Sequence, residues 1–175
     1  IVRDSRKEFK RYGVIFTRMA SRAVHIELIN DLSTDSFINA LRCFIAIRGP
    51  IRQLRSDRGT NFVRARNKLT RALREENSEF HQFCQSDSFD FVFNTPNASH
   101  MGGVWEWQIR TLRSVLNAML SSHKSRLDSV TLRTFLYEVM AIINCRPLGT
   151  WDSNDEASSN PLTPNMLLMM KSKVI

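Results

Sequence analysis

Two carboxylates constrain what this chain can fold into more than any other feature. Asp57 closes the short apolar run 51–54 and stands just ahead of Gly59, a pattern that predicts the tip of a strand where the chain opens into a loop. Glu106 follows a pair of glycines and opens an amphipathic stretch that reaches Ser122. We therefore expect Glu106 in the first turn of a helix, where the backbone dipole favours a negative charge. Carboxylates from two separate elements can share hard divalent cations, which prefer oxygen ligands.

The periodicity of the rest of the chain predicts an α/β domain. Residues 12–19 and 23–29 are rich in β-branched and apolar side chains and flank a polar turn, which indicates a hairpin. The run Ser33-Thr34-Asp35 supplies oxygens that start a helix, and Gly49-Pro50 ends it. The remaining predicted elements are a strand at 51–55, a basic helix at 64–76, a strand at 89–93, and helices at 104–122 and 130–144.

Composition limits the class of protein and the partner. A chain of 175 residues with 42% hydrophobic residues is about one domain with a real core. The net charge of +8 favours a polyanionic partner, and the basic residues gather near the start and after Asp57, although charge alone can also serve solubility. The three cysteines, Cys43, Cys84 and Cys145, are odd in number and widely spaced. This spacing argues against a disulfide framework or a zinc site and favours a reducing compartment.

The ends of the chain suggest its context. No apolar run approaches the roughly 18 residues of a membrane span, and no signal peptide opens the chain, so we expect a soluble protein with no membrane partner. From 150 to 164 the composition shifts to acidic residues, serine and proline, which predicts a surface loop. We expect the chain to be a piece of a longer polypeptide.

Six segments carry a resemblance to a known family. They are 10–16 (KRYGVIF), 22–27 (RAVHIE), 34–37 (TDSF), 56–62 (SDRGTNF), 98–106 (ASHMGGVWE) and 142–148 (IINCRPL). In this order they resemble the integrase catalytic core of BEL/Pao-type LTR retrotransposon polyproteins, within the retroviral integrase superfamily. The resemblance covers nearly the whole chain and implies a ribonuclease H-like α/β fold, with a mixed five-stranded sheet flanked by helices. It implies a catalytic core at 1–149, followed by a surface loop and C-terminal extension at 150–175.

The same resemblance implies a function and its partners. It implies DNA integration by a polynucleotidyl transferase: metal-dependent 3′-end processing of element DNA, then strand transfer into target DNA. The family holds two Mg²⁺ or Mn²⁺ ions with an Asp, Asp, Glu triad, and Asp57 and Glu106 match its second and third members. The resemblance also implies partners: element-end DNA, target DNA, further copies of the chain in a homo-oligomer, and the remaining domains of a polyprotein. It implies a nuclear location, reached from a cytoplasmic pre-integration particle.

The first triad aspartate has no match at the family's position. In the family it stands just ahead of the segment that corresponds to Ile1-Val2-Arg3, so we expect a truncated first central strand and an inactive fragment of an active parent protein. Asp4 is the alternative ligand, but the residues 5–8 that follow it are typical of a turn between two strands. Arg58 is a second departure, because many integrases carry asparagine there; it changes the charge beside the metals but not the ligand.

Four further residues are assigned to DNA binding through the resemblance. Arg110 and Arg113 lie four and seven places after Glu106, where basic residues of retroviral integrases approach the DNA end. Their alternative is a solvated helix face with a Glu106–Arg110 pair worth under about 1 kcal/mol. Asn61 and His100 are assigned to the same role, although each could instead bond to loop backbone.

The tryptophans that flank Glu106 differ in their expected roles. Trp105 falls on the apolar face of the predicted helix and is expected in the core. Trp107 points away from that face, so it could stack on an unpaired base or pack against a neighbouring subunit. His25 alternates within a strand and is expected to be structural.

Two other functions stay open at this point. A non-catalytic nucleic-acid or protein-binding module of ribonuclease H-like fold, degenerate or host-adopted, agrees with the missing aspartate. A different nuclease of this fold, acting on RNA–DNA hybrids, agrees less well, because the Gly-Gly-Val-Trp-Glu context resembles integrase. An Asp-Tyr-Phe-Gly-Pro-like run upstream of Ile1 would favour catalysis in the parent protein.

Overall fold

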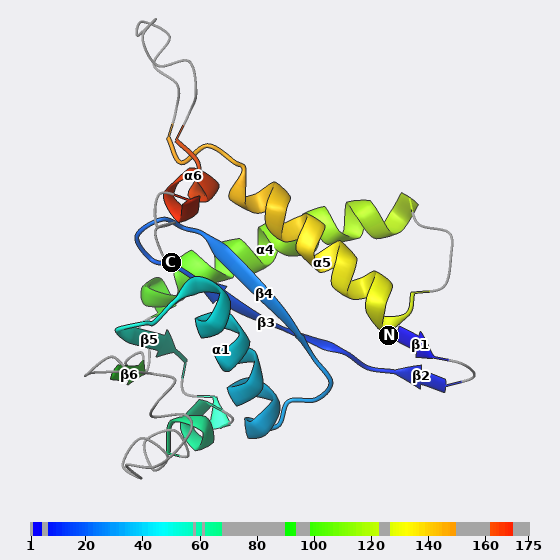
Figure 1. Cartoon of the computed structure of the whole chain (residues 1–175), viewed down its shortest axis with the longest axis horizontal. Coiled ribbons are helices and arrows are strands. Elements are labelled where there is room, and N and C mark those ends of the chain that lie inside the picture. The colour runs from blue at the N-terminus through cyan, green and yellow to red at the C-terminus, as the bar shows by residue number, and fades with distance from the viewer. Residues whose placement is uncertain are drawn as a thin grey trace, which may run out of the picture. The chain divides into compact units, whose positions relative to one another are not determined.

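The computed structural model describes the backbone of residues 2–4, 7–57, 59–60, 62–67, 90–93, 99–122, 127–149 and 162–169. Strands and helices follow one another as the sequence pattern predicts, with further short strands at the start (Figure 1). The strands are β1 (Val2–Asp4), β2 (Lys7–Phe9), β3 (Tyr12–Thr17), β4 (Val24–Ile29), β5 (Gln53–Ser56) and β6 (Asp90–Phe93). The helices are α1 (Thr34–Arg48), α4 (Ser99–Ser122), α5 (Ser129–Asn144) and α6 (Pro164–Met169). Residues 62–67 are also helical, and the rest of the predicted helix 64–76 lies outside the described residues.

The chain divides into two compact units. One, the α4–α5 unit, comprises Ile1–Phe9, Ile15–Ile26 and Val104–Ile175. The other, the β5–β6 unit, comprises Lys10–Val14 and Glu27–Gly103. Strands β3 and β4 each contribute residues to both units.

In the described part of the chain the strands pair as three two-stranded sheets, β1–β2, β3–β4 and β5–β6. β1 and β2 are antiparallel, with Asp4 opposite Lys7, whereas β5 and β6 are parallel, with Ser56 opposite Phe93. The mixture of parallel and antiparallel pairs agrees with the expected α/β class. The expected five-stranded sheet is not shown, because these three pairs are not joined by ladders among the described residues.

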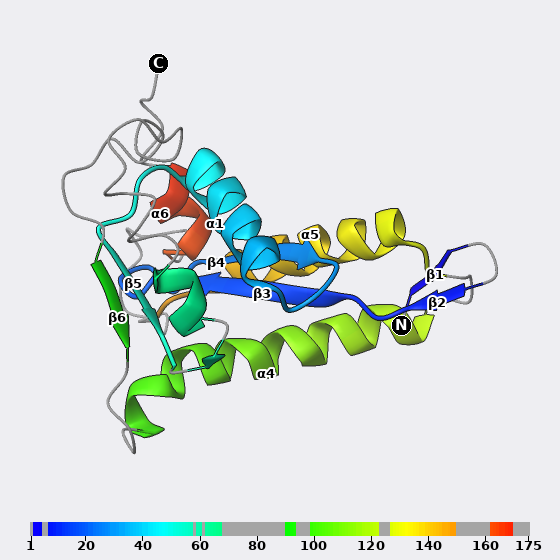
Figure 2. The same ribbon diagram turned by 90° about the horizontal axis from the view of Figure 1, so that it is seen from below.

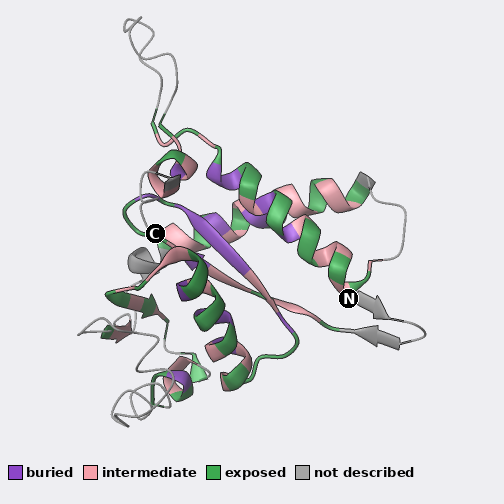
Figure 3. Cartoon of the chain, viewed as in Figure 1, coloured by how far each residue is buried: buried purple, intermediate pink, exposed green. Residues whose placement is uncertain are grey.

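The β3–β4 hairpin confirms the hairpin predicted at 12–19 and 23–29. Its turn is closed by hydrogen bonds from Arg18 N–H to the Ala23 carbonyl at 2.8 Å and from Arg22 N–H to the Arg18 carbonyl at 2.8 Å. In β4 the consecutive residues Val24, His25 and Ile26 are all buried (Figure 3). The burial of His25 agrees with the structural role expected for it.

Helix α1 confirms its predicted boundaries through both of its caps. Ser33 is the N-cap, and its hydroxyl accepts a hydrogen bond from Ser36 N–H at 3.2 Å. Hydrogen bonds from Ser33 and then from Ser36 hold the pKa of the Asp31 carboxyl below its usual value. Gly49 ends the helix at a φ of +84°, in the left-handed region that favours glycine. The buried face of α1 consists of Phe37, Ala40, Leu41 and Ile45.

Two buried amides tie the helices of the α4–α5 unit to the hairpin. The Asn144 side chain, at the end of α5, donates to the Val24 carbonyl and accepts from Val24 N–H, both at 2.8 Å. Gln108 of α4 donates through Nε2 to the Arg22 carbonyl at 3.0 Å. Helix α4 accordingly runs along one side of the hairpin segment 15–26 (Figure 2).

The C-terminal extension predicted at 150–175 contains a helix as well as loop. α6 contacts α5, and its first residue, Pro164, is fully buried. Burial of this proline gives the short helix a packing role that its polar flanking sequence did not indicate. None of the helices in the described residues is both long and apolar enough to cross a membrane.

Candidate metal and nucleic-acid site

Asp57 lies directly after the C-terminal end of β5, as the sequence predicts. Ser56 is the last residue of that strand and pairs with Phe93 of the parallel strand β6. The Asp57 side chain is exposed, and its Oδ1 accepts a hydrogen bond from Gly59 N–H at 3.1 Å. This bond fixes the direction of the carboxylate without burying it, so oxygen remains available to a cation.

The loop that carries Asp57 is anchored by Phe62. The Gly59 carbonyl accepts hydrogen bonds from Phe62 N–H at 2.9 Å and Val63 N–H at 3.1 Å, which starts the helical turn of 62–67. The Phe62 ring packs edge-on against Phe37 of α1, with centroids 5.1 Å apart. The carboxylate therefore stands between a strand end and an aromatic anchor, both within the β5–β6 unit.

Gly59 is required by a close approach. A Cβ at this position would lie 3.1 Å from Asp57 Oδ1 and 3.3 Å from Phe62 Cδ2. Both distances are shorter than ordinary van der Waals contacts, so any larger residue would displace one of these side chains. Each of the three residues therefore has a local role. Asp57 accepts the Gly59 N–H, Gly59 leaves room for the carboxylate, and Phe62 packs against Phe37.

Glu106 is exposed on α4, but its expected place in the first turn is wrong. The helix begins at Ser99, so Gly102 and Gly103 lie inside it and Glu106 stands about two turns from its start. The glycine pair weakens a helix without ending it, because the long amphipathic run that follows stabilises the helix through packing. The helix dipole acts within the first turn and therefore does not stabilise the Glu106 carboxylate.

The polar stripe predicted on α4 is exposed throughout. Glu106, Arg110, Arg113 and Asn117 all face solvent. The apolar side chains of the neighbouring face are half-buried or buried: Trp105, Ile109, Leu112, Leu116 and Met119. The arrangement presents the glutamate and two arginines on one open surface of the helix.

The remaining candidates have different outcomes. Asn61 and Arg58 lie outside the described residues, and His100 belongs to α4 but its side chain is not described. Asp4 ends β1 and pairs with Lys7 of the antiparallel strand β2, so the turn predicted at 5–8 is wrong at Lys7 and Glu8, which belong to that strand. Asp57 belongs to the β5–β6 unit and Glu106 to the α4–α5 unit.

Each of the two carboxylates, taken by itself, has the chemistry that a hard divalent cation prefers. Asp57 and Glu106 are exposed carboxylates, which offer the oxygen ligands that Mg²⁺ and Mn²⁺ prefer. Among the described residues, no group of three His, Cys, Asp or Glu side chains is arranged to hold a metal ion. The metal-ligand roles of Asp57 and Glu106 therefore stay predictions from the sequence.

Sequence analysis missed a second polar cluster in the α4–α5 unit. The Arg146 guanidinium lies over the Trp107 ring, 4.2 Å from its centroid. Burial, and then the nearby charge of Arg22, lower the pKa of Arg146. Gln108, one residue after Trp107, is 1% exposed and binds the Arg22 carbonyl. Arg146 lies in segment 142–148, one of the six that carry the resemblance, but the sequence pattern does not show that Arg146 contacts α4.

The described architecture is the ribonuclease H-like α/β fold of retroviral integrase catalytic cores. A chain of the simian T-cell lymphotropic virus intasome in complex with PP2A regulatory subunit B56 gamma is similar with a TM-score of 0.62, at 15% identity over 93% of this chain and 50% of that one. The HTLV-2 integrase catalytic core domain in complex with magnesium, in a trimeric form, gives a TM-score of 0.54 at 17% identity, over 85% of this chain and 82% of that one. The BIV integrase catalytic core domain gives 0.61 at 15% identity, over 90% and 85%.

At 15–17% identity these similarities establish the fold of the chain, and its chemistry has to be argued from its own residues. The chain spans half the length of the simian virus chain that it matches. No protein-family model matches the sequence. No curated protein matches it either.

Proposed function

We propose that the chain is the catalytic domain of a DNA integrase of the BEL/Pao retrotransposon type, which processes the 3′ ends of element DNA and transfers them into target DNA. The observation that carries the proposal is the exposed Asp57 carboxylate, held by Gly59 N–H at the end of β5 in an integrase-core fold. Glu106, exposed on α4, supplies the second carboxylate. Both residues also match the triad of the family that the sequence resembles.

The two carboxylates would hold Mg²⁺ or Mn²⁺. A bound metal pair supplies an activated attacking oxygen and stabilises the leaving oxygen of an in-line displacement. The chain's own contribution is positional: Gly59 N–H orients Asp57, and the exposed Arg110 and Arg113 meet the phosphates of the DNA end. Asn61 and His100 are proposed to act with them.

The partners follow from the same proposal. Element-end DNA and target DNA are the substrates, and the remaining domains of a polyprotein accompany this one. Two of the similar structures are assemblies, an intasome and a trimeric form, which supports a homo-oligomer. The site of action is proposed to be the nucleus, which the protein reaches from a cytoplasmic particle.

Substitution of each carboxylate by its amide tests the proposal. In the full-length protein, Asp57→Asn and Glu106→Gln should each abolish Mn²⁺-dependent joining of labelled oligonucleotides, because each removes an anionic ligand and almost no volume. Circular dichroism should show an unchanged fold. Glu138→Gln, at an exposed glutamate on α5, is the matched control and should join at the wild-type rate.

Asp4→Asn decides the position of the first ligand in the same assay. Asp4 stands opposite Lys7 in a strand pair, so its loss should leave joining unchanged. Loss of joining in this variant would make Asp4 a ligand. Retained joining in Asp57→Asn or Glu106→Gln would refute the metal-site assignment and favour a non-catalytic binding module of the same fold.

A further inference from the structure

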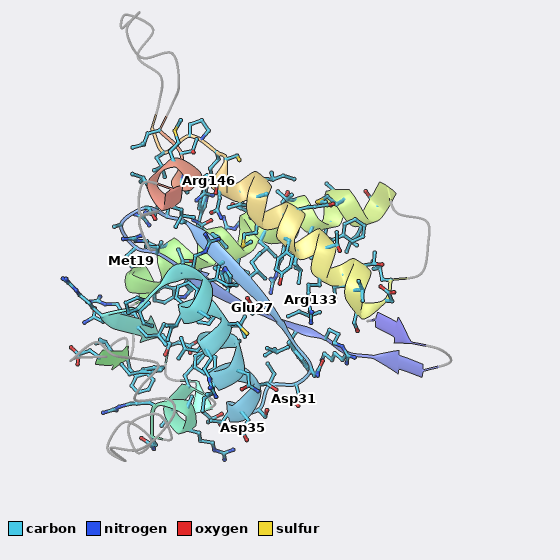
Figure 4. The ribbon with its side chains drawn as sticks, viewed as in Figure 1. Met19, Glu27, Asp31, Asp35, Arg133 and Arg146 are labelled. Carbon is cyan, nitrogen blue, oxygen red and sulfur yellow. The ribbon has the colours of Figure 1, made fainter. Side chains whose placement is uncertain are left out.

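Arg146 has a buried guanidinium nitrogen that no described residue satisfies. It follows the C-terminal end of α5 (Figure 4), and its Nη1 is buried with no hydrogen-bond partner among the described residues. Burial, and then the positive charge of Arg22, lower the pKa of Arg146. A partly desolvated guanidinium beside a second cation is costly unless an anion compensates for it.

Arg22 is held in an unusual backbone conformation. Its φ of +55° lies in the left-handed region, which costs an arginine roughly 1 kcal/mol and which glycine or asparagine adopts more easily. The conformation is held through the backbone of Arg22 alone: its N–H donates to the Arg18 carbonyl within the turn, and its carbonyl accepts from Gln108 Nε2 of α4. The turn therefore does not require an arginine, and the exposed Arg22 side chain calls for another explanation.

Structural roles account for only part of this cluster. A basic residue near the C-terminal end of α5 is favoured by the helix dipole, by about 0.3–1 kcal/mol. Stacking on Trp107 adds roughly 0.5–2 kcal/mol and links α5 to α4. Both roles explain Arg146, but neither explains the second arginine nearby. Asn144, two residues before Arg146, is bonded to Val24, two residues after Arg22, and these bonds bring the two segments together.

We propose that Arg22 and Arg146 together bind one phosphate of a nucleic-acid backbone, and that Trp107 contacts the adjoining sugar or base. Guanidinium groups are suited to phosphate because their N–H donors match its oxygens in pairs. Trp107 is 49% exposed, which leaves ring surface for stacking in addition to the face that Arg146 covers. The net charge of +8 favours a polyanion as the partner, and the exposed Trp107 ring, which can stack on a base, favours nucleic acid among polyanions.

This contact deepens the proposed function, since it rests on DNA as the partner. It adds a second phosphate site, at the end of the β3–β4 hairpin, to the Arg110 and Arg113 stripe. Arg22, Trp107 and Arg146 act here as positioning residues for DNA and not on the reacting atoms.

Equilibrium binding of a short fluorescein-labelled DNA duplex to the full-length protein, measured by anisotropy at several salt concentrations, tests the site. In the double variant Arg22→Asn, Arg146→Ala, the slope of log K against log salt should fall in magnitude by about 0.9, the value for one phosphate contact on duplex DNA. Arg133→Ala removes an exposed arginine from the other end of α5 (Figure 4) and should leave the slope unchanged.

Two further measurements separate this binding site from fold and from catalysis. Arg22→Asn alone should unfold at the same or a higher temperature than wild type, because asparagine tolerates the left-handed conformation, yet it should bind DNA more weakly. Asp57→Asn should retain the full salt slope, so failure of the catalytic proposal is distinguishable from failure of this one. An unchanged salt slope in the double variant would overturn the site. The site would also be overturned if the double variant lost binding of polyglutamate but kept its DNA binding.

Discussion

At the scale of single residues, the loop after β5 shows how closely its neighbours position the Asp57 carboxylate. The N–H of Gly59 orients Asp57, and the lack of a Cβ in Gly59 leaves room for the carboxylate. Phe62 then fixes the far end of the loop against Phe37. Position and chemistry are thus set by three residues within one short segment.

Gly59→Ala should reduce activity more than stability. The added Cβ meets Asp57 Oδ1 at 3.1 Å and Phe62 Cδ2 at 3.3 Å, so the carboxylate must shift. We expect joining to fall by about tenfold and the free energy of unfolding to change by less than about 1 kcal/mol.

Gly49→Ala is the matched control and should show the reverse. Its φ is +84° and nothing lies within 4 Å of its added Cβ, so the cost is backbone strain of about 1 kcal/mol with joining unaffected. Kinetics of oligonucleotide joining and urea denaturation measure the two effects. Wild-type joining in Gly59→Ala would show that the carboxylate does not need its observed orientation.

At the scale of elements, the sequence predicted those helix boundaries that depend on neighbouring residues, and it did not predict features that depend on distant ones. The boundaries of α1 follow from the Ser33 cap and from Gly49, which act on their own neighbours, so the sequence specified them. The start of α4 was missed because packing of its long amphipathic run outweighs the weak helix propensity of two glycines. The roles of Gln108 and Asn144 could not be predicted, because their partners lie far along the chain.

Asn144→Ala should destabilise the α4–α5 unit strongly. Val24, which is 1% exposed, would lose the partners of both its N–H and its carbonyl. At about 1–3 kcal/mol for each unsatisfied buried group, we expect a loss of roughly 3 kcal/mol in the free energy of unfolding.

Urea denaturation measures this loss, and Asn117→Ala, on the exposed stripe of α4, is the control expected to change stability by under about 0.5 kcal/mol. A loss below about 1 kcal/mol in Asn144→Ala would mean that water satisfies the Val24 backbone once the amide is removed.

At the scale of the whole molecule, the sequence predicted the class of fold better than the assembly of the site. The hairpin, α1 and the strands β5 and β6 occur close to where periodicity and turn chemistry predicted them, and the similar structures are integrase cores. The parallel pairing of β5 with β6 was not predicted. The Asp57 loop was predictable because its signals are local. The Arg22–Arg146 cluster was not, because a hairpin turn, α4 and the end of α5 must pack together to form it.

The central claim is that Asp57 and Glu106 bind the catalytic metal ions, and direct titration with Mn²⁺ followed by electron paramagnetic resonance tests it most directly. In the full-length protein we expect saturable Mn²⁺ binding that Asp57→Asn and Glu106→Gln each weaken at least about tenfold, because each amide removes one anionic oxygen ligand. Glu138→Gln should bind as the wild type does. Undiminished Mn²⁺ binding in both amide variants would contradict the account.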